Sequence, residues 1–118
     1  MQPVDFVHGL TTECRDAAVA DCVATFESPP GRRPAQSLVE LSRWFLDLQP
    51  TDRDLVIRAM HEAADATLFG VLCVLDGVRT IEAHTAKSEF TVTAMRDGAV
   101  SVISPNDGFL HDIYRSEA

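Results

Sequence analysis

The chain has 118 residues, of which 46% are hydrophobic and 24% charged, a composition typical of one globular domain that excludes a disordered chain. Its formal net charge of −8 excludes the basic surface that binding to nucleic acid or to an anionic membrane requires. The acidity fits either a basic protein partner or simple solubility. We therefore expect a single domain over residues 1–118 that binds neither nucleic acid nor membrane.

The cysteines and the N-terminus indicate the compartment. Cys14, Cys22 and Cys73 are odd in number and form no CxxC pair, so we expect small buried hydrophobic side chains in a reducing environment. The first residues lack the basic and apolar regions of a signal peptide, and residues 68–75 are too few to span a bilayer. These features predict a cytoplasmic protein.

Two amphipathic helices are predicted before the middle of the chain. The first covers residues 3–26, begins at Pro3 and carries one apolar stripe at spacings of three and four residues. The stripe consists of Val7, Leu10, Cys14, Ala18, Cys22 and Phe26. The second helix covers residues 35–48. Its apolar face consists of Leu38, Leu41, Phe45 and Leu48, broadened by Val39 and Trp44.

The longest apolar segment predicts a third helix over residues 51–76. Thr51 follows a proline and suits the N-cap position, and Asp76-Gly77 can end the helix because glycine enters the left-handed conformation. Gly70 weakens a helix by about 1 kcal/mol relative to alanine, so a strand over residues 71–75 is the alternative. The short connection from the second helix makes these two helices antiparallel or steeply crossed neighbours.

After Gly77 the hydrophobic period changes from 3.6 to 2. Strands are predicted over residues 78–83, 89–96 and 99–104, with a linker over 84–87 and an Asp-Gly turn at positions 97 and 98 that is typical of a hairpin. A short helix follows near the C-terminus. The predicted fold is α+β: three N-terminal helices packed on a three-stranded antiparallel meander, with a short C-terminal helix.

The predicted hairpin has one face for the helices and one open face. If Asp97 and Gly98 form the turn, Arg96 faces Ala99 and Val92 faces Ile103. The side chains turned toward the helices are Phe90, Val92, Ala94 and Ile103. The open face then carries the apolar side chains Met95, Val100 and Val102, which either the C-terminal segment or a second subunit could cover.

Chemistry-bearing residues are sparse. His61 and Asp65 lie one helical turn apart, as two metal ligands can, but no further ligands accompany them, and a surface His–Asp pair is the better interpretation. His111 beside Asp112 could act as a general base, yet no nucleophile is marked for it. The sequence has no serine-hydrolase elbow, phosphate loop or dinucleotide fingerprint. We therefore predict no enzyme, no metal and no cofactor.

Positive charge gathers only in the loop SPPGRRP at residues 28–34. Arg32 and Arg33 could hold a carboxylate or phosphate, or they could bridge to acidic helices of the same molecule, which is the favoured interpretation. An anion or small-molecule site built on Arg32, Arg33 and His111 is the alternative function that this loop suggests.

Three stretches carry a resemblance to other proteins: SPPGRRP, LFGVLCVLDGVR at residues 68–79, and LHDIY at residues 110–114. Together they resemble a group of small uncharacterised bacterial proteins over most of the chain, a resemblance that implies no activity. In size, charge and layout the chain also resembles bacterial toxin-immunity proteins, which bind and neutralise a toxin. That resemblance concerns the class only and implies a protein partner.

The leading hypothesis is a non-enzymatic protein-binding domain with an immunity- or antitoxin-like role. Acidic side chains would steer a basic partner toward the domain, and the candidates are Glu13, Asp16, Asp107 and Asp112. The rival hypothesis is the anion-binding protein described above. A homodimer is the third, because apolar side chains remain on the open sheet face and on the second half of the long helix.

Overall fold

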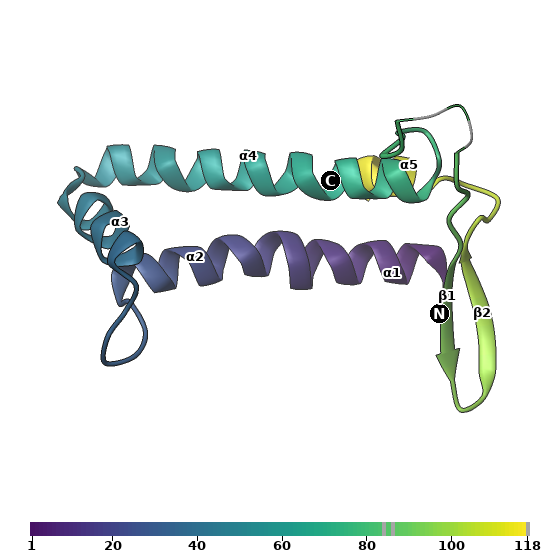
Figure 1. Ribbon diagram of the computed structural model, residues 1–118, viewed down its shortest axis with the longest axis horizontal. Coiled ribbons are helices and arrows are strands. Elements are labelled where there is room, and N and C mark those ends of the chain that lie inside the picture. The colour runs from purple at the N-terminus through teal and green to yellow at the C-terminus, as the bar shows by residue number, and fades with distance from the viewer. Residues whose placement is uncertain (84, 86, 118) are drawn as a thin grey trace.

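The computed structural model describes residues 1–83, 85 and 87–117 as an elongated α+β structure (Figure 1). Two long helical rods run antiparallel beside each other, and a shorter helix joins them at one end. The first rod is a continuous run of α1 (Pro3–Leu10), the π-helical segment η1 (Thr11–Asp16) and α2 (Ala17–Glu27). The connecting helix is α3 (Gln36–Asp47), and the second rod is α4 (Pro50–Leu75).

The opposite end of the rods carries the remaining elements. A hairpin of β1 (Val92–Arg96) and β2 (Ala99–Ser104) extends past α1, and α5 (Leu110–Glu117) lies against α1 and α4 (Figure 1). The chain thus runs along the long axis of the molecule twice, with α3 connecting the rods at one end and the hairpin and α5 packed at the other.

The π-helical segment η1 explains why the predicted single stripe of the first helix is wrong. A π turn adds one residue, so the face directed at the neighbouring rod changes phase along the sequence. Val7 and Phe26 are buried as predicted, but after η1 the buried residue is Val19, and the predicted Ala18 is exposed. Cys14, predicted to be buried, is exposed. Arg15 instead turns toward the helices.

The long helix is continuous through Gly70, so the alternative strand over residues 71–75 is wrong. It begins one residue earlier than predicted, with Pro50 in the first turn and Gln49 as an extended N-cap, as expected for a residue before proline. It ends at Leu75, and Gly77, whose φ is +78°, turns the chain out of the helix. There the Gly77 N–H donates to the Val74 carbonyl and the Val78 N–H to the Cys73 carbonyl, a Schellman arrangement.

The predicted three-stranded meander is also wrong, because the sheet in the described part of the chain has two strands. Residues 78–83 alternate in hydrophobicity but have no neighbouring strand to pair with. Their first two N–H groups, of Val78 and Arg79, both donate to the Cys73 carbonyl at the end of α4. Ile81 is therefore left exposed. Positions 84 and 86 of the predicted linker lie outside the described residues.

The hairpin turn forms as predicted, with Arg96 opposite Ala99 and positive φ at Asp97 and Gly98. The register then changes between Val92 and Thr93, so that Val92 faces Ser104 instead of Ile103. This irregularity turns Ile103 into the core, where it is buried, whereas Phe90 precedes the strand and is partly exposed.

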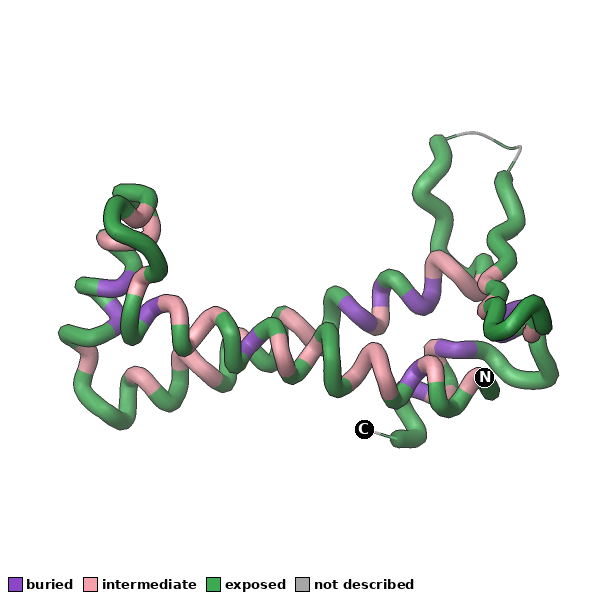
Figure 2. Tube along the Cα trace, turned by 90° about the horizontal axis from the view of Figure 1, so that it is seen from below, coloured by how far each residue is buried: buried purple, intermediate pink, exposed green. Residues whose placement is uncertain are grey.

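The core is divided between the two ends of the rods (Figure 2). The larger cluster, at the hairpin end, joins α1, α4, β2 and α5. It consists of Val7, Leu68, Leu72, Ile103, Leu110 and Tyr114. At the α3 end Phe26 packs against Phe45 with ring centroids 5.7 Å apart. Between the clusters Val19 is buried, but most neighbouring residues are exposed or half-buried.

Such an arrangement is far from compact. The radius of gyration is 18.2 Å, whereas a compact domain of this length has about 13.5 Å. The accessible surface is 8291 Å², whereas a compact monomer of this mass exposes about 6,300 Å². The chain therefore exposes about 2,000 Å² more than a compact domain would.

Gly70 offers a test of what shapes the long helix. A Cβ at this position would meet only the guanidinium of Arg79, an exposed side chain that can move aside. We expect Gly70→Ala to raise the free energy of unfolding by about 1 kcal/mol, the helix-propensity difference. Gly77→Ala is the matched control and should lower it by about 1–2 kcal/mol, because its φ is left-handed. Urea unfolding measures both. A destabilising Gly70→Ala would mean that the Arg79 cover matters more than helix propensity.

Candidate functional site

The four acidic residues predicted to meet a partner occupy different surroundings. Glu13 lies exposed on η1, and Asp107 lies exposed in the turn before α5. Asp16 accepts a 2.9 Å hydrogen bond from Arg15 Nε, and Asp112 lies 3.3 Å from His111 Nε2. Two of the four carboxylates are thus engaged within the chain, and Glu13 and Asp107 have no ion pair among the described residues.

His111 is held by a carboxylate that the sequence marked only as a helix end. Asp76, whose side chain is 1% exposed, accepts hydrogen bonds from the backbone N–H groups of Leu110 and His111 at 3.0 and 2.8 Å. Its Oδ2 also lies 2.6 Å from His111 Nδ1. The ring of His111 stacks on Phe109. Phe109, the residue that precedes α5, has no side-chain oxygen to accept the first N–H groups of this helix. Asp76 accepts them instead and caps α5 from the end of α4.

A second polar cluster joins the two rods to α5. The Tyr114 hydroxyl donates to Asp65 Oδ1 at 2.6 Å and accepts from Arg15 Nη1 at 3.0 Å. Arg115 Nη1 donates to both Asp65 oxygens, at 3.1 and 2.9 Å. Asp65 therefore binds residues far away in sequence, and the predicted pairing with the exposed His61 is wrong. Sequence spacing could not have found this cluster, since Asp65 lies 49 residues from Tyr114, and Arg15 lies 99 residues from Tyr114.

The contacts within this cluster shift the pKa values of its members. The hydrogen bond from Tyr114, together with Arg115, lowers the pKa of Asp65. Burial and the hydrogen bond to Asp65 raise the pKa of Tyr114. The bonds to Asp16 and Tyr114 raise the pKa of Arg15 still further above its usual range. The lowered pKa of Asp65 favours its carboxylate, and the raised pKa values of Tyr114 and Arg15 favour their protonated forms. These are the forms that make the hydrogen bonds of the cluster, as is typical of a structural network.

Arg32 and Arg33 are exposed in the loop between α2 and α3. Neither makes an ion pair with a described residue, so the favoured bridging interpretation is wrong. The loop lies at the α3 end of the molecule, whereas α5, which carries His111, lies toward the hairpin end (Figure 1). The three residues of the alternative anion site are therefore not brought together.

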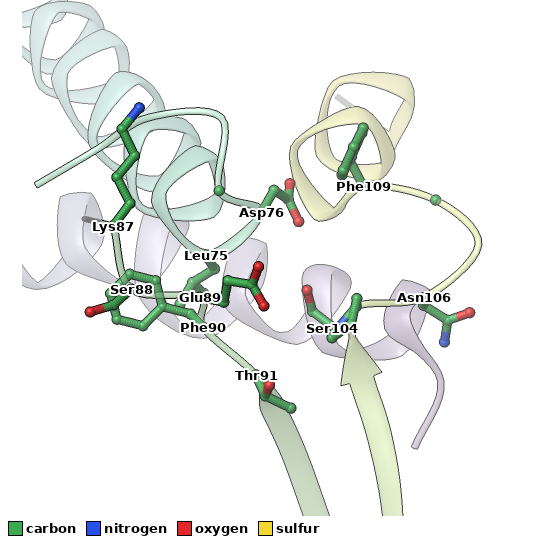
Figure 3. A pocket seen from close by; sticks show the side chains of 13 residues that line it. Leu75, Asp76, Lys87, Ser88, Glu89, Phe90, Thr91, Ser104, Asn106 and Phe109 are labelled. Atoms are coloured by element: carbon green, nitrogen blue, oxygen red, sulfur yellow. The ribbon is translucent and has the colours of Figure 1, made fainter. Parts of the chain in front are cut away.

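A cavity of about 530 Å³ lies beside Asp76, between the end of α4, residues 87–91 and the turn before α5 (Figure 3). Its polar lining includes Lys87, Ser88, Glu89 and Asn106. Asp76 already accepts three contacts, and Ser88 Oγ donates to Glu82 at 3.0 Å. Among the described residues, no histidine lines this cavity. In the described part of the chain no three His, Cys, Asp or Glu residues gather closely enough to hold a metal ion.

The clearest uncovered surface is the outer side of the hairpin. Met95 lies opposite Val100 in the ladder, and Val102 follows two residues later on the same side. Their side chains are 74%, 60% and 48% exposed. We call these three residues the hairpin face. The C-terminal segment does not cover them, because α5 packs on α1 and α4 instead.

A second uncovered apolar surface lies on α3. Leu38, Ser42 and Phe45 point toward the rest of the molecule, and the Ser42 hydroxyl donates to the Phe26 carbonyl. Leu41 and Trp44, one turn apart, lie on the flank of the helix and are 45% and 50% exposed. We call these two residues the α3 face. Tryptophan is frequent among the residues that dominate protein interfaces.

Comparisons with known proteins identify no relative: no family model, no curated protein and no solved structure matches the chain. Within the described ranges no helix has both the length and the hydropathy needed to cross a membrane. The two apolar faces and the charge around them are the features of this chain that bear on its function.

The Asp65 cluster predicts a definite pH dependence. Because its native pKa is lowered, the native state favours the carboxylate, and the resulting stability is complete above the unfolded pKa. It is lost as pH falls from about 5 through the native pKa. We expect the stability difference between wild type and Asp65→Asn, measured by urea unfolding, to shrink steadily over that interval. Tyr114→Phe should reduce the slope, since it removes the largest cause of the shift. A difference independent of pH would contradict the network.

Proposed function

We propose that the chain is a non-enzymatic, cytoplasmic protein-binding domain that presents the hairpin face and the α3 face to another protein. The observation that carries this proposal is the exposure of large apolar side chains on both faces, which reaches 74% for Met95 and 50% for Trp44. Soluble monomers rarely leave contiguous apolar side chains uncovered, and when they do such patches mark binding surfaces.

The buried and half-buried polar side chains support the same proposal, because they are already bonded to one another within the chain. Asp76 and His111 fasten α5 to α4, and Asp65 and Tyr114 fasten α5 to both rods. A catalytic centre needs a base with a reacting group within reach and an open place for substrate. These groups are instead engaged with one another, so they explain the fold and leave binding to the apolar faces.

Charge gives the proposal a more specific form. The net charge of −8 and the exposed carboxylates of Glu13 and Asp107 favour a basic partner. Acidic side chains around an apolar contact raise the rate of encounter, and the apolar contact slows dissociation. An immunity-like role, in which this domain covers the working surface of a basic protein, is the form of binding that such an arrangement supports.

The apolar part of the proposal is tested by affinity capture with the full chain. The variant carries glutamate on both faces, at Leu41, Trp44, Met95 and Val100, all of which are exposed in the monomer. We expect wild type expressed in its own host to retain a stoichiometric protein, whether another protein or a differently tagged copy of itself, at least tenfold better than the variant. Circular dichroism checks that both are folded. Equal retention by the two baits would contradict the proposal.

The electrostatic part is tested on the captured partner. Reversing Glu13 and Asp107 to lysine should lower the association rate about tenfold at low salt, because both lie exposed where they can steer encounter. The effect should vanish near 1 M salt, where the screening length is about 3 Å. Stopped-flow association measures both. Binding that responds neither to salt nor to reversal would remove the acidic mechanism and leave the apolar one.

A further inference from the structure

The two strands of the hairpin carry backbone groups that point away from each other. Positive φ at both turn residues makes the turn a two-residue type I′ turn, so the flanking residues Arg96 and Ala99 exchange both hydrogen bonds of the ladder. Bonded and non-bonded pairs then alternate along an antiparallel ribbon. Met95 and Val100 therefore form a non-bonded pair, and the N–H and C=O groups of both residues point outward from the ribbon.

The two edges of the hairpin differ in how far they are occupied. On β2, Asn106 Nδ2 donates to the Val102 carbonyl at 3.4 Å, and the register change leaves Ile103 without an opposite residue. On β1, the outward groups belong to Thr93 and Met95, which are both exposed. Among the described residues no backbone group pairs with them. We call the outward N–H and C=O groups of Thr93 and Met95 the β1 edge.

The β1 edge lacks the features that keep strands from pairing with other chains. Such edges are normally blocked by proline, by charged side chains along the strand or by a bulge. The strand reads VTAMR, so it contains no proline, and its one charged residue, Arg96, stands next to the turn. The extra residue at the register change lies on β2. The β1 edge is therefore an open template for one more strand.

We infer that the β1 edge binds an extended segment of the basic partner, which adds a third hydrogen-bonded strand to the sheet. The inference rests on the proposed function, because it names how the partner of the hairpin face is held. Main-chain hydrogen bonds hold such a strand, and its side chains alternate between the two sides of the sheet. Those on the outer side lie beside Met95 and extend the hairpin face. The third strand also stabilises the hairpin, because a two-stranded ribbon is marginal in water.

Charge favours a basic segment over a second copy of this chain. Glu89 precedes β1 and Asp97 follows it, and both are exposed. Neither forms an ion pair with a described residue. Lysine or arginine at the two ends of a short added strand lies near these carboxylates. A second copy brings a further net charge of −8 and is repelled.

Amide hydrogen exchange of the full chain, measured by NMR, tests the inference with a defined probe. The probe is an acetylated and amidated octapeptide that has lysine at each end and alternating valine and threonine between. We expect saturating peptide to slow exchange about tenfold at Thr93 and Met95, whose N–H groups the new strand covers. Val100 and Val102 should continue to exchange fast. Slowing that is confined to β2, equal on both edges or absent from both would overturn the inference.

Two proline variants separate the β1 edge from the apolar side chains. Met95→Pro removes an outward N–H from β1, and Val100→Pro removes one from β2. Neither N–H belongs to the ladder, so the hairpin can still form, and slow exchange at Ala94 checks that it does. We expect Met95→Pro to weaken peptide binding about tenfold and Val100→Pro by no more than about twofold. Equal weakening would mean that the apolar contact alone binds the peptide, and would overturn the inference.

The peptide provides a further test that needs no variant of the protein. N-methylation of every second residue removes N–H donors from one side of the strand only. One of the two alternate sets should abolish binding, whereas the other set, with the same number of methyl groups, should preserve it. Equal effects of the two sets would contradict strand addition.

Two further outcomes distinguish the possible occupants. Slow exchange at Thr93 and Met95 that rises with protein concentration in the absence of peptide would mean that a second copy pairs with the β1 edge, and would overturn the basic segment. None of these peptide results decides the proposed function. That function fails only if wild type and the variant with glutamate on both faces retain a protein equally well in the capture experiment.

Discussion

One buried carboxylate, that of Asp76, fixes the start of α5 to the end of α4. Asp76 completes the last turn of α4, and its side chain accepts the first N–H groups of α5, which follows 34 residues later. A helix end buried without acceptors is costly, because each orphan N–H loses its hydrogen bond to water. Since Asp76 supplies them, α5 stays on α4, and its Leu110 and Tyr114 can join the core with Leu72. The hairpin between the two helices is placed as a consequence.

The second constraint is the π turn in the first rod. It places Arg15 toward Tyr114 and Asp65, and so converts what would be an apolar stripe into a polar connection between rods. Apolar packing is then confined to the two ends, around Leu72 and around Phe45. Hydrogen bonds to charged groups contribute about 1.5–3 kcal/mol each. The middle of the molecule is aligned by this network and held only weakly by packing.

Local signals in the sequence predicted the local structure well. Periodicity and proline placed the helices predicted over residues 35–48 and 51–76 within one residue of the bounds of α3 and α4, whereas the single helix predicted over residues 3–26 is divided into α1, η1 and α2. Asp97-Gly98 predicted the hairpin turn and its first pair. What the sequence could not supply was contact between distant segments. The alternation in residues 78–83 predicts a strand only if a neighbouring strand exists to pair with it. The Schellman turn at Gly77 instead ties the first residues of this segment to the end of α4. Asp76 and Asp65 had plausible local roles as a stop signal and a histidine partner, and their actual partners are about 35 and 50 residues away.

The faces proposed for binding are continuations of the same two clusters that hold the chain folded. The hairpin face is the reverse side of the strands that bury Ile103, and the α3 face is the flank of the helix that buries Phe45. A protein that covers either face therefore packs on an element whose other side is already buried in the monomer. A partner that binds the native state alone adds its binding free energy to the stability of the fold. Under the proposed function, the incomplete cover of the monomer and its binding to another protein are one property, because the partner would supply the side chains that cover each face.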